Sequence, residues 1–501
     1  MNNTQIKKEL NRLKEIDKEI SILNSAANLL WWDRATLMPA KAAEERAEQI
    51  SFIAVLIHEK TTSKELNRII LNLSKNITKL NNIEKAIVTN YSWKLSRINK
   101  LPKKYVSELF KITGLAQHYW EIAKKNNDFK LFEPYLEKIF ELKKKEAKYI
   151  DPKKHPYEVL LQDYERGITL KILDETFNKL KNELKIIIEK VKKSSKYGKE
   201  FNINAFTLPK EIQKITCQEI STMILDDNER FLIAESRHPF MTKISPNDLR
   251  ITTSFRNPLF SFLSTAHESG HALYESQFGK ELKYTILYDA PSLGIHESQS
   301  RLWENQIVRS INFWRFYYPK YKKYFPQLKN VSLEKFYESI NIVRPSLIRI
   351  ESDELTYNIH IIIRYEIEKE VLEGKLKVKD IPKVWNFKYK EYLGIEPKTY
   401  SEGLLQDVHW SQGSIAYFPT YSLGTIYSAM IYEQMLKENT KLENEISNGN
   451  FNFIKNWLKE KIHKHGSKLT TLEIINGACK KDVDILPLIN YYKKKFYGIY
   501  L

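Results

Sequence analysis

Residues 267–271 read His-Glu-Ser-Gly-His, a combination that could hold a metal ion and activate a water molecule. If this segment is helical, His267 and His271 lie four residues apart and project from the same face, about 40° from each other. Two imidazoles placed in this way can share one Zn²⁺ ion. Glu268 can then accept the proton of a metal-bound water, which is the metallopeptidase arrangement. The pentapeptide alone is only moderately specific, because these residues can also come together by chance on a surface helix.

A third ligand decides between these interpretations, since a catalytic zinc uses three protein ligands and keeps one position open. Glu297 lies 26 positions after the second histidine and is expected to open the next helix. The turn signals Pro291 and Gly294 allow the chain to reverse and bring Glu297 back to the first helix. A second candidate, Glu304, lies two turns further along. We prefer Glu297, although a helix-start residue favoured by the helix macrodipole is its alternative role.

The elements that must position these residues are expected to be mainly helical. Residues 261–278 around the motif have apolar side chains at helical spacing and no proline. Gly270 costs up to ~1 kcal/mol inside a helix, which is tolerable if substrate or backbone approaches it closely. The same periodicity predicts helices near 4–28, 41–58, 82–100, 103–125, 130–149, 168–194, 297–324, 333–343, 352–372, 420–439, 451–462 and 484–497.

Two interruptions of this helical pattern are expected. Asp33 and Pro39 separate the first two helices. Residues 231–255 alternate in polarity, are rich in β-branched residues and contain Pro, Asn and Asp turns, so they predict a short antiparallel sheet. An edge strand of this sheet, beside the helix that carries the motif, could hold an extended peptide by main-chain hydrogen bonds.

Composition favours one helical domain over residues 1–501, which could form two lobes flanking a cleft. The chain has no Gly/Ser tract and no Pro-rich spacer, and 15 Gly and 17 Pro are few for 501 residues. The net charge of +18 comes from 80 Lys and Arg against 62 Asp and Glu. Because the surplus is mostly lysine spread along helices, we interpret it as solvated surface and expect no nucleic-acid partner.

The N-terminal residues form a charged amphipathic helix without an apolar core, which is not typical of a signal peptide. No uninterrupted apolar stretch of about 18 residues exists, so no transmembrane helix and no membrane partner are expected. Cys217 and Cys479 lie far apart in the sequence and are expected to be free thiols in a reducing compartment. These features predict a cytoplasmic protein.

Several ordered motifs together resemble the carboxypeptidase Taq family of zinc metallocarboxypeptidases, also called thermostable carboxypeptidases, nearly from end to end. Three small departures occur, at Ser352 and Ala416, where the family usually has Ala and Gly, and at Asn358, where it often has Pro. The matching stretches are HESGH, HESQSR (296–301), WDRATLMP (32–39), HPF (238–240), DLRIT (248–252), IRIESDELTY (348–357), GLLQDVHW (403–410), AYFPTYSLG (416–424) and WLKEKIHKHGSKLT (457–470).

The resemblance implies a large, mainly α metallopeptidase fold with a deep central cleft and a small antiparallel sheet beside the zinc helix. It implies a carboxypeptidase that removes C-terminal amino acids from peptides with broad specificity, and it suggests a homodimer. Co²⁺ or Mn²⁺ could replace Zn²⁺ in a site of two histidines and one glutamate. A zinc oligopeptidase that cuts internal bonds is the first alternative. A basic protein that binds RNA or acidic partners is the second, but it would have no need of Glu268.

Peptide hydrolysis also needs a donor that stabilises the oxyanion. His409, Tyr417 and Tyr421 could each donate from the loop at 408–421, and the resemblance favours His409 and Tyr421. Tyr417 is expected to contact the substrate. Packing is the alternative for any one tyrosine, since the chain has 29 of them.

An exopeptidase must also bind the free C-terminal carboxylate, which suits a planar guanidinium. Arg349 is the first candidate, because the resemblance places the matching arginine in the substrate cleft, and Arg250 is the second. Each could instead form a structural salt bridge, for Arg349 with Asp353 four residues later. His238 is expected to line the cleft or to cap an element. If both residues are helical, His296 points about 100° away from Glu297. We therefore interpret His296 as a residue that supports the site rather than as a metal ligand.

Overall fold

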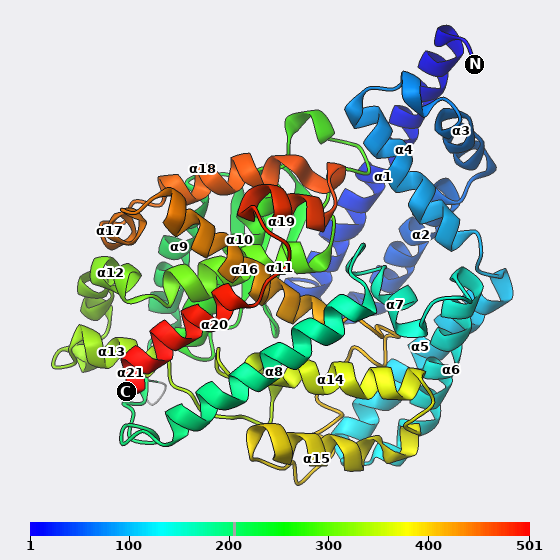
Figure 1. Cartoon of the computed structure of the whole chain (residues 1–501). Coiled ribbons are helices and arrows are strands. Elements are labelled where there is room, and N and C mark those ends of the chain that lie inside the picture. Colours follow the sequence, from blue (N-terminus) through cyan, green and yellow to red (C-terminus); the bar gives the residue numbers. More distant parts are fainter. Residues whose placement is uncertain (204–206) are drawn as a thin grey trace.

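Helices account for most of the chain in the computed structural model, which describes residues 1–203 and 207–501 (Figure 1). The helices before the sheet are α1 (Asn3–Thr36), α2 (Ala43–Thr61), α3 (Lys64–Ser74), α4 (Asn82–Ile98), α5 (Lys103–Asn126), α6 (Glu133–Ile150), α7 (Pro156–Leu161), α8 (Leu170–Lys192) and α9 (Lys210–Leu225). Several begin at a side chain that caps the free backbone N–H groups of the first turn. Asn81, for example, accepts from Glu84 N–H, while the Glu84 carboxylate accepts from Asn81 N–H.

The sheet is followed by the helices that carry most of the predicted site. They are α10 (Pro258–Ser276), α11 (Leu293–Arg301), the π-helix η6 (Leu302–Val308), α12 (Ile311–Tyr324), α13 (Leu333–Ile340), α14 (Tyr357–Leu372), α15 (Ile381–Leu393), α16 (Pro419–Glu438), α17 (Leu442–Ser447), α18 (Asn452–Lys461), α19 (Thr471–Cys479), α20 (Leu486–Tyr492), the π-helix η11 (Lys493–Tyr497) and α21 (Gly498–Tyr500). In Figure 1, α10, α11 and α16 lie at the centre, and both α10 and α16 pack against α11.

The sheet has three strands, β1 (Phe231–Glu235), β2 (Phe240–Ser245) and β3 (Asp248–Thr253), in the order β1-β3-β2. β2 and β3 form the expected antiparallel hairpin, but β1 runs parallel to β3, so the sheet is mixed rather than antiparallel. The alternation of polarity predicts strands but not their spatial order, and here β3 inserts between β1 and β2. Both β2 and β3 pack against α10, and β2 is an edge strand.

Most buried apolar side chains form one large cluster that extends from α5 to the C-terminal helices. A smaller cluster fills the space between α1, α3 and α4 and takes in Leu282 and Leu287 from the loop after α10. The two cysteines are free and buried, Cys217 in α9 and Cys479 at the end of α19. Among the described residues, no helix is both long and apolar enough to cross a membrane.

Some predicted boundaries are wrong for identifiable reasons. α1 runs through Asp33 to Thr36, because the Asp33 carboxylate pairs with Arg46 of α2 instead of ending the helix. The helix expected to open at Glu297 begins at Leu293, because the Ser292 hydroxyl caps it by accepting from Ile295 N–H. Helical periodicity in the sequence did not predict six of the helices, namely α3, α7, α9, α15, α17 and α19.

Candidate active site

His267 and His271 on α10 and Glu297 on α11 form a compact group of side chains that could hold a metal ion, and we call these three residues the metal-binding group. Their ligand atoms all lie within 4.8 Å of one another. The Glu297 Oε2 atom is 3.5 Å from the Nε2 atom of each histidine. Atoms that ligate one tetrahedral zinc ion at about 2.0–2.1 Å lie ~3.3 Å apart. The spacing and the donor types therefore fit a single zinc-like cation.

Two glycines let the helices approach closely enough to form this group. A Cβ atom on Gly270 would lie 2.7 Å from the Gln299 carbonyl oxygen and 2.8 Å from Ser300 Cα, so the backbone of α11 occupies the space beside it. This confirms the close approach expected at Gly270. A Cβ atom on Gly424 of α16 would lie 2.7 Å from Glu297 Cβ. Glu297 is thus fixed between α10 and α16.

The second carboxylate considered as a ligand, Glu304, lies on the far side of His267. Its Oε2 atom is 2.9 Å from His267 Nδ1, which leaves His267 Nε2 directed to the group. Arg301 bridges the two carboxylates, with Nε donating to Glu297 Oε1 at 2.7 Å and Nη1 to Glu304 Oε2 at 3.3 Å. Because Arg301 occupies Oε1 of Glu297, Oε2 is the atom that can face a cation. Metal-ligating histidines commonly donate their other N–H to a carboxylate, as His267 can to Glu304.

His296 supports the other histidine. Its ring stacks on His271 with centroids 4.1 Å apart and planes 15° apart. Its Nε2 atom lies 2.9 Å from Glu275 Oε1, and Glu275 pairs at 2.7 Å with Lys243 of β2. This chain of contacts connects the edge strand to the helix that carries both histidines.

The electrostatics of the group favour a bound positive charge. Burial opposes charge on His267, but Glu297 and Glu304 outweigh it and raise the pKa of His267 to about 10. Burial, with His296 nearby, lowers the pKa of His271 to about 3, so this imidazole is neutral, as a metal ligand must be. A divalent cation in the site would neutralise the Glu297 carboxylate, while Glu304 accepts the Nδ1–H of a neutral His267.

Glu268 faces a cleft of about 900 Å³ that also contains the metal-binding group. Burial raises the pKa of Glu268 to about 7, which suits a proton acceptor near neutral pH. Phe240 and Met241 of β2 line the same cleft, and so do Tyr417, Tyr421 and Arg349.

The three candidate oxyanion donors are close together but not equivalent. Tyr417 and Tyr421 line the cleft with ring centroids 5.5 Å apart. His409 lies behind them and is not among the lining residues, but its Nε2 atom is 3.1 Å from the Tyr421 hydroxyl. Burial lowers the pKa of His409 to about 4. A neutral His409 can therefore orient the Tyr421 hydroxyl.

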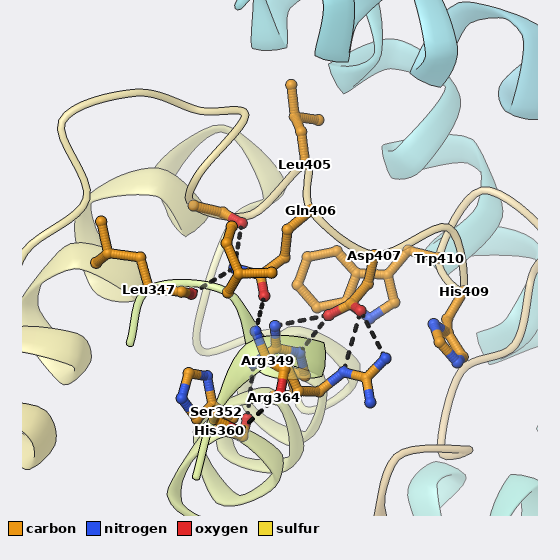
Figure 2. A network of polar contacts seen from close by, with 12 residues as sticks. Leu347, Arg349, Ser352, His360, Arg364, Leu405, Gln406, Asp407, His409 and Trp410 are labelled. Atoms are coloured by element: carbon orange, nitrogen blue, oxygen red, sulfur yellow. Dashed lines mark hydrogen bonds and ion pairs between the residues drawn. The ribbon is translucent and has the colours of Figure 1, made fainter. Parts of the chain in front are cut away.

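Arg349 is buried in the wall of the cleft and is held by Asp407 rather than by Asp353 (Figure 2). Its Nε and Nη2 atoms donate to Asp407 Oδ1 at 3.0 and 2.9 Å, and its Nη1 atom donates to the Tyr357 hydroxyl at 3.0 Å. Asp353 instead accepts from the backbone N–H groups of Leu355 and Thr356.

Arg250 and His238 are not among the residues that line this cleft, although Pro239 and Phe240, which follow His238, do line it. Arg250 on β3 pairs with Asp248 and lies over the ring of the buried Trp32, 4.8 Å from its centroid. This contact joins the WDRATLMP and DLRIT stretches. His238 lies between β1 and β2, where its carbonyl oxygen accepts from the Ser236 hydroxyl at 2.6 Å.

Sequence reasoning missed the partners of Arg349. Asp407 binds both Arg349 and the fully buried Arg364 of α14. Asp407 belongs to the GLLQDVHW stretch, so the resemblance to the family was the one signal in the sequence that could have drawn attention to Asp407. The pairing spans 58 residues, which no helical or strand spacing predicts. Arg301 of the HESQSR stretch was likewise not singled out.

Comparison with known proteins adds a separate line of evidence. A family model described as carboxypeptidase Taq (M32) metallopeptidase matches residues 12–496. Carboxypeptidase 1 of Bacillus subtilis is 39% identical over 492 residues, which cover 97% of this chain and 97% of that protein. Thermostable carboxypeptidase 1 of Pyrococcus furiosus is 36% identical over 482 residues, which cover 96% of this chain and 96% of that protein. A solved M32 carboxypeptidase from Deinococcus radiodurans R1 superposes with a TM-score of 0.95 at 32% identity, over 98% of this chain and 99% of that one.

Proposed function

The chain belongs to the carboxypeptidase Taq (M32) family of metallopeptidases, and from this premise we propose that it removes C-terminal amino acids of broad type from peptides with a zinc ion held by His267, His271 and Glu297. The chain is a metallocarboxypeptidase, and its substrates are peptides. The observation that carries the proposed site is the 3.5 Å spacing of Glu297 Oε2 from both histidine Nε2 atoms. Co²⁺ and Mn²⁺ would also suit these donors.

Glu268 is the proposed general base. When bound, zinc lowers the pKa of a coordinated water to about 7 and polarises the scissile carbonyl. Glu268 lies in the wall of the cleft and follows His267 in the chain, and burial raises its pKa to about 7. It accepts a proton from the attacking water and passes the proton to the nitrogen of the departing amino acid.

Tyr421 is the proposed donor to the oxyanion, with His409 acting through it. The hydroxyl of Tyr421 can donate to the cleft while its oxygen accepts from His409 Nε2–H at 3.1 Å. Burial raises the pKa of Tyr421 well above its usual value, so the hydroxyl keeps its proton. Tyr417 beside it is proposed to contact the substrate. Arg250 and His238 stay predictions as substrate contacts, with support from the resemblance alone.

Arg349 is the proposed anchor of the terminal carboxylate, and the edge strand β2 is the proposed guide for the peptide main chain. Arg349 lines the cleft together with the metal-binding residues, so a peptide held at its carboxylate would present its last peptide bond near the cation. Phe240 and Met241 of β2 border the same space.

The test compares a short peptide with its C-terminal amide for the wild type and for Arg349→Lys. Lysine keeps the charge but loses the planar fork. Loss of a hydrogen bond to a charged group costs ~1.5–3 kcal/mol, or roughly 10–150-fold in kcat/KM for the free acid. The preference for the acid should fall by that factor while zinc stays bound. An unchanged preference in the variant would remove Arg349 from the site and make Arg250 the next candidate. Equal cleavage of acid and amide by the wild type would favour an oligopeptidase.

We further propose that residues 1–501 act as one domain and that the protein is a cytoplasmic homodimer. The large apolar cluster that joins α5 to the C-terminal helices supports one domain. The homodimer rests on the family resemblance, and the location rests on the two free cysteines, which suit a reducing compartment. Sedimentation of the purified protein tests the dimer directly.

A further inference from the structure

The hydrogen-bond donors of Arg349 are divided unevenly between the protein and the cleft. A guanidinium has five N–H groups in a fixed planar fork. Arg349 uses three of these N–H groups within the protein. Its Nε and Nη2 atoms donate to Asp407 Oδ1, and its Nη1 atom donates to the Tyr357 hydroxyl. One N–H on Nη1 and one on Nη2 have no partner among the described residues. Asp407 therefore occupies the Nε–Nη2 edge, and the remaining N–H groups of Nη1 and Nη2 can bind a ligand.

Asp407 is itself fixed from its other side. Its Oδ2 atom accepts from Arg364 Nε at 2.7 Å and lies 2.6 Å from Arg364 Nη2 (Figure 2). Arg364 is fully buried; its Nη1 atom donates to the His360 carbonyl oxygen at 2.8 Å, and its guanidinium lies 4.6 Å from the ring centroid of Trp385. With both oxygens of its carboxylate bound by arginines, Asp407 cannot rotate without breaking a charged contact.

The charges of this group explain why two arginines are needed. A single Arg349–Asp407 pair would be neutral and would attract a carboxylate only weakly. Arg364 adds a second positive charge, so the three side chains together carry one net positive charge inside the protein. Both arginines hold the pKa of Asp407 far below its usual range although its burial acts in the opposite direction.

The residue before Asp407 fixes the backbone of Arg349. Gln406 Oε1 accepts from Arg349 N–H at 2.8 Å, and Gln406 Nε2 donates to the Leu347 carbonyl oxygen at 3.0 Å. Gln406 thus holds the main chain on both sides of Ile348, while Asp407 holds the guanidinium. The two consecutive residues determine both the position and the orientation of Arg349.

We infer that Asp407, braced by Arg364, is a positioning residue for recognition of the substrate: it turns the remaining N–H groups of Arg349 Nη1 and Nη2 to the cleft, where they bind the C-terminal α-carboxylate through two N–H···O bonds. This inference rests on the proposed role of Arg349 as the carboxylate anchor. Asp407 does not touch the substrate and acts only through Arg349.

The test uses Asp407→Asn with a short peptide and its C-terminal amide. An asparagine side chain has one oxygen and one NH₂ group, so it can accept from one arginine but presents N–H to the other. The KM for the free acid should rise roughly 10–100-fold, as is usual for loss of a charged hydrogen-bond partner. The kcat for the acid, the rate on the amide and the zinc content should change less than about threefold. Asp353→Asn is the matched control, because Asp353 lies in the same stretch as Arg349 but, among the residues that the structure describes, bonds only to Thr356 and to backbone N–H groups.

Two further variants keep the inference open to refutation. If Asp407→Asn does not fold, Arg364→Lys retains a cation beside Asp407 but loses the fork, and it should lower the preference for the acid roughly 3–10-fold. The double variant Arg349→Lys/Asp407→Asn should prefer the acid no less than Arg349→Lys alone, since Asp407 acts through Arg349. A full preference for the acid in folded Asp407→Asn or Arg364→Lys would overturn the inference. If Arg349→Lys also kept that preference, the proposed anchor itself would be wrong.

Discussion

Glu304 and Glu297 should differ in a measurable way when each is replaced, because only Glu297 faces the proposed metal position. Glu304→Ala removes the acceptor 2.9 Å from His267 Nδ1 but leaves all three proposed ligands in place. Glu297→Ala removes a ligand itself. We therefore expect Glu304→Ala to weaken zinc binding and Glu297→Ala to prevent stoichiometric zinc binding.

The size of the Glu304 effect follows from the contacts that it loses. Loss of the partner that orients a ligating histidine typically weakens metal binding 10–100-fold. This corresponds to about 1.4–2.8 kcal/mol, since each factor of ten is about 1.4 kcal/mol. The range agrees with the ~1.5–3 kcal/mol expected for one hydrogen bond to a charged group. Glu304→Gln is the matched variant, because its amide oxygen can still accept from His267 while the negative charge is lost.

The assay is competition for Zn²⁺ between the protein and a chromophoric chelator at fixed pH and salt, with far-UV circular dichroism as the control for folding. We expect the zinc Kd to rise 10–100-fold in Glu304→Ala and less than tenfold in Glu304→Gln. Equal losses in these two variants would show that the charge of Glu304 matters rather than its hydrogen bond. A wild-type Kd in Glu297→Ala would refute the assignment of the third ligand.

Three further outcomes follow from the site and its surroundings. Glu268→Gln should keep its zinc and lose 10²–10⁴-fold in kcat, and retention of more than about a tenth of the wild-type kcat would contradict its role as general base. Gly424→Ala should lower both zinc affinity and melting temperature, because its Cβ would lie 2.7 Å from Glu297 Cβ, whereas Gly114→Ala, with no neighbour within 4 Å, should stabilise α5 by up to ~1 kcal/mol. Burial raises the pKa of Glu165 from 4.5 to about 8, so the stability that this carboxyl contributes is present below pH 4.5 and is lost as the pH rises through 8. The loss amounts to at most roughly 5 kcal/mol, and Glu165→Gln should remove it. The measurement is the melting temperature of the wild type and of the variant from pH 5 to 9. The same pH dependence in both proteins would argue against this role of Glu165.

Local patterns predicted most of the helices and the shared helix of His267 and His271, because helical periodicity depends only on nearby residues. The position of Glu297 near the two histidines was also predictable, since Pro291 lies just before α11, where the chain turns back toward α10. The position of Glu304 beside His267 was not predictable. Glu304 lies in η6, which is a π-helix, and the sequence gives no sign of the wider turn of such a helix. The stack of His296 on His271 depends in the same way on how α11 crosses α10.

Contacts between distant segments account for the remaining differences. Asp353 was the alternative local partner considered for Arg349, but the structure pairs Arg349 with Asp407, which lies 58 residues away in a different loop. Arg250 was the second candidate for the substrate carboxylate, and the structure places its guanidinium over the ring of the buried Trp32. Each of these outcomes depends on tertiary packing, which outweighs the weaker preferences of neighbouring residues.

The separate apolar cluster of α1, α3 and α4 affects how denaturation of this protein should be interpreted. This cluster is small and meets the rest of the molecule partly through Leu282 and Leu287, so it can open at a lower free energy than the helices around the metal-binding group. Heating would then release the N-terminal helices before the site is lost. Under such sub-global unfolding, one melting temperature does not describe the whole chain. Part of the helical signal would then be lost in a first transition, and zinc release and inactivation would follow together in a second.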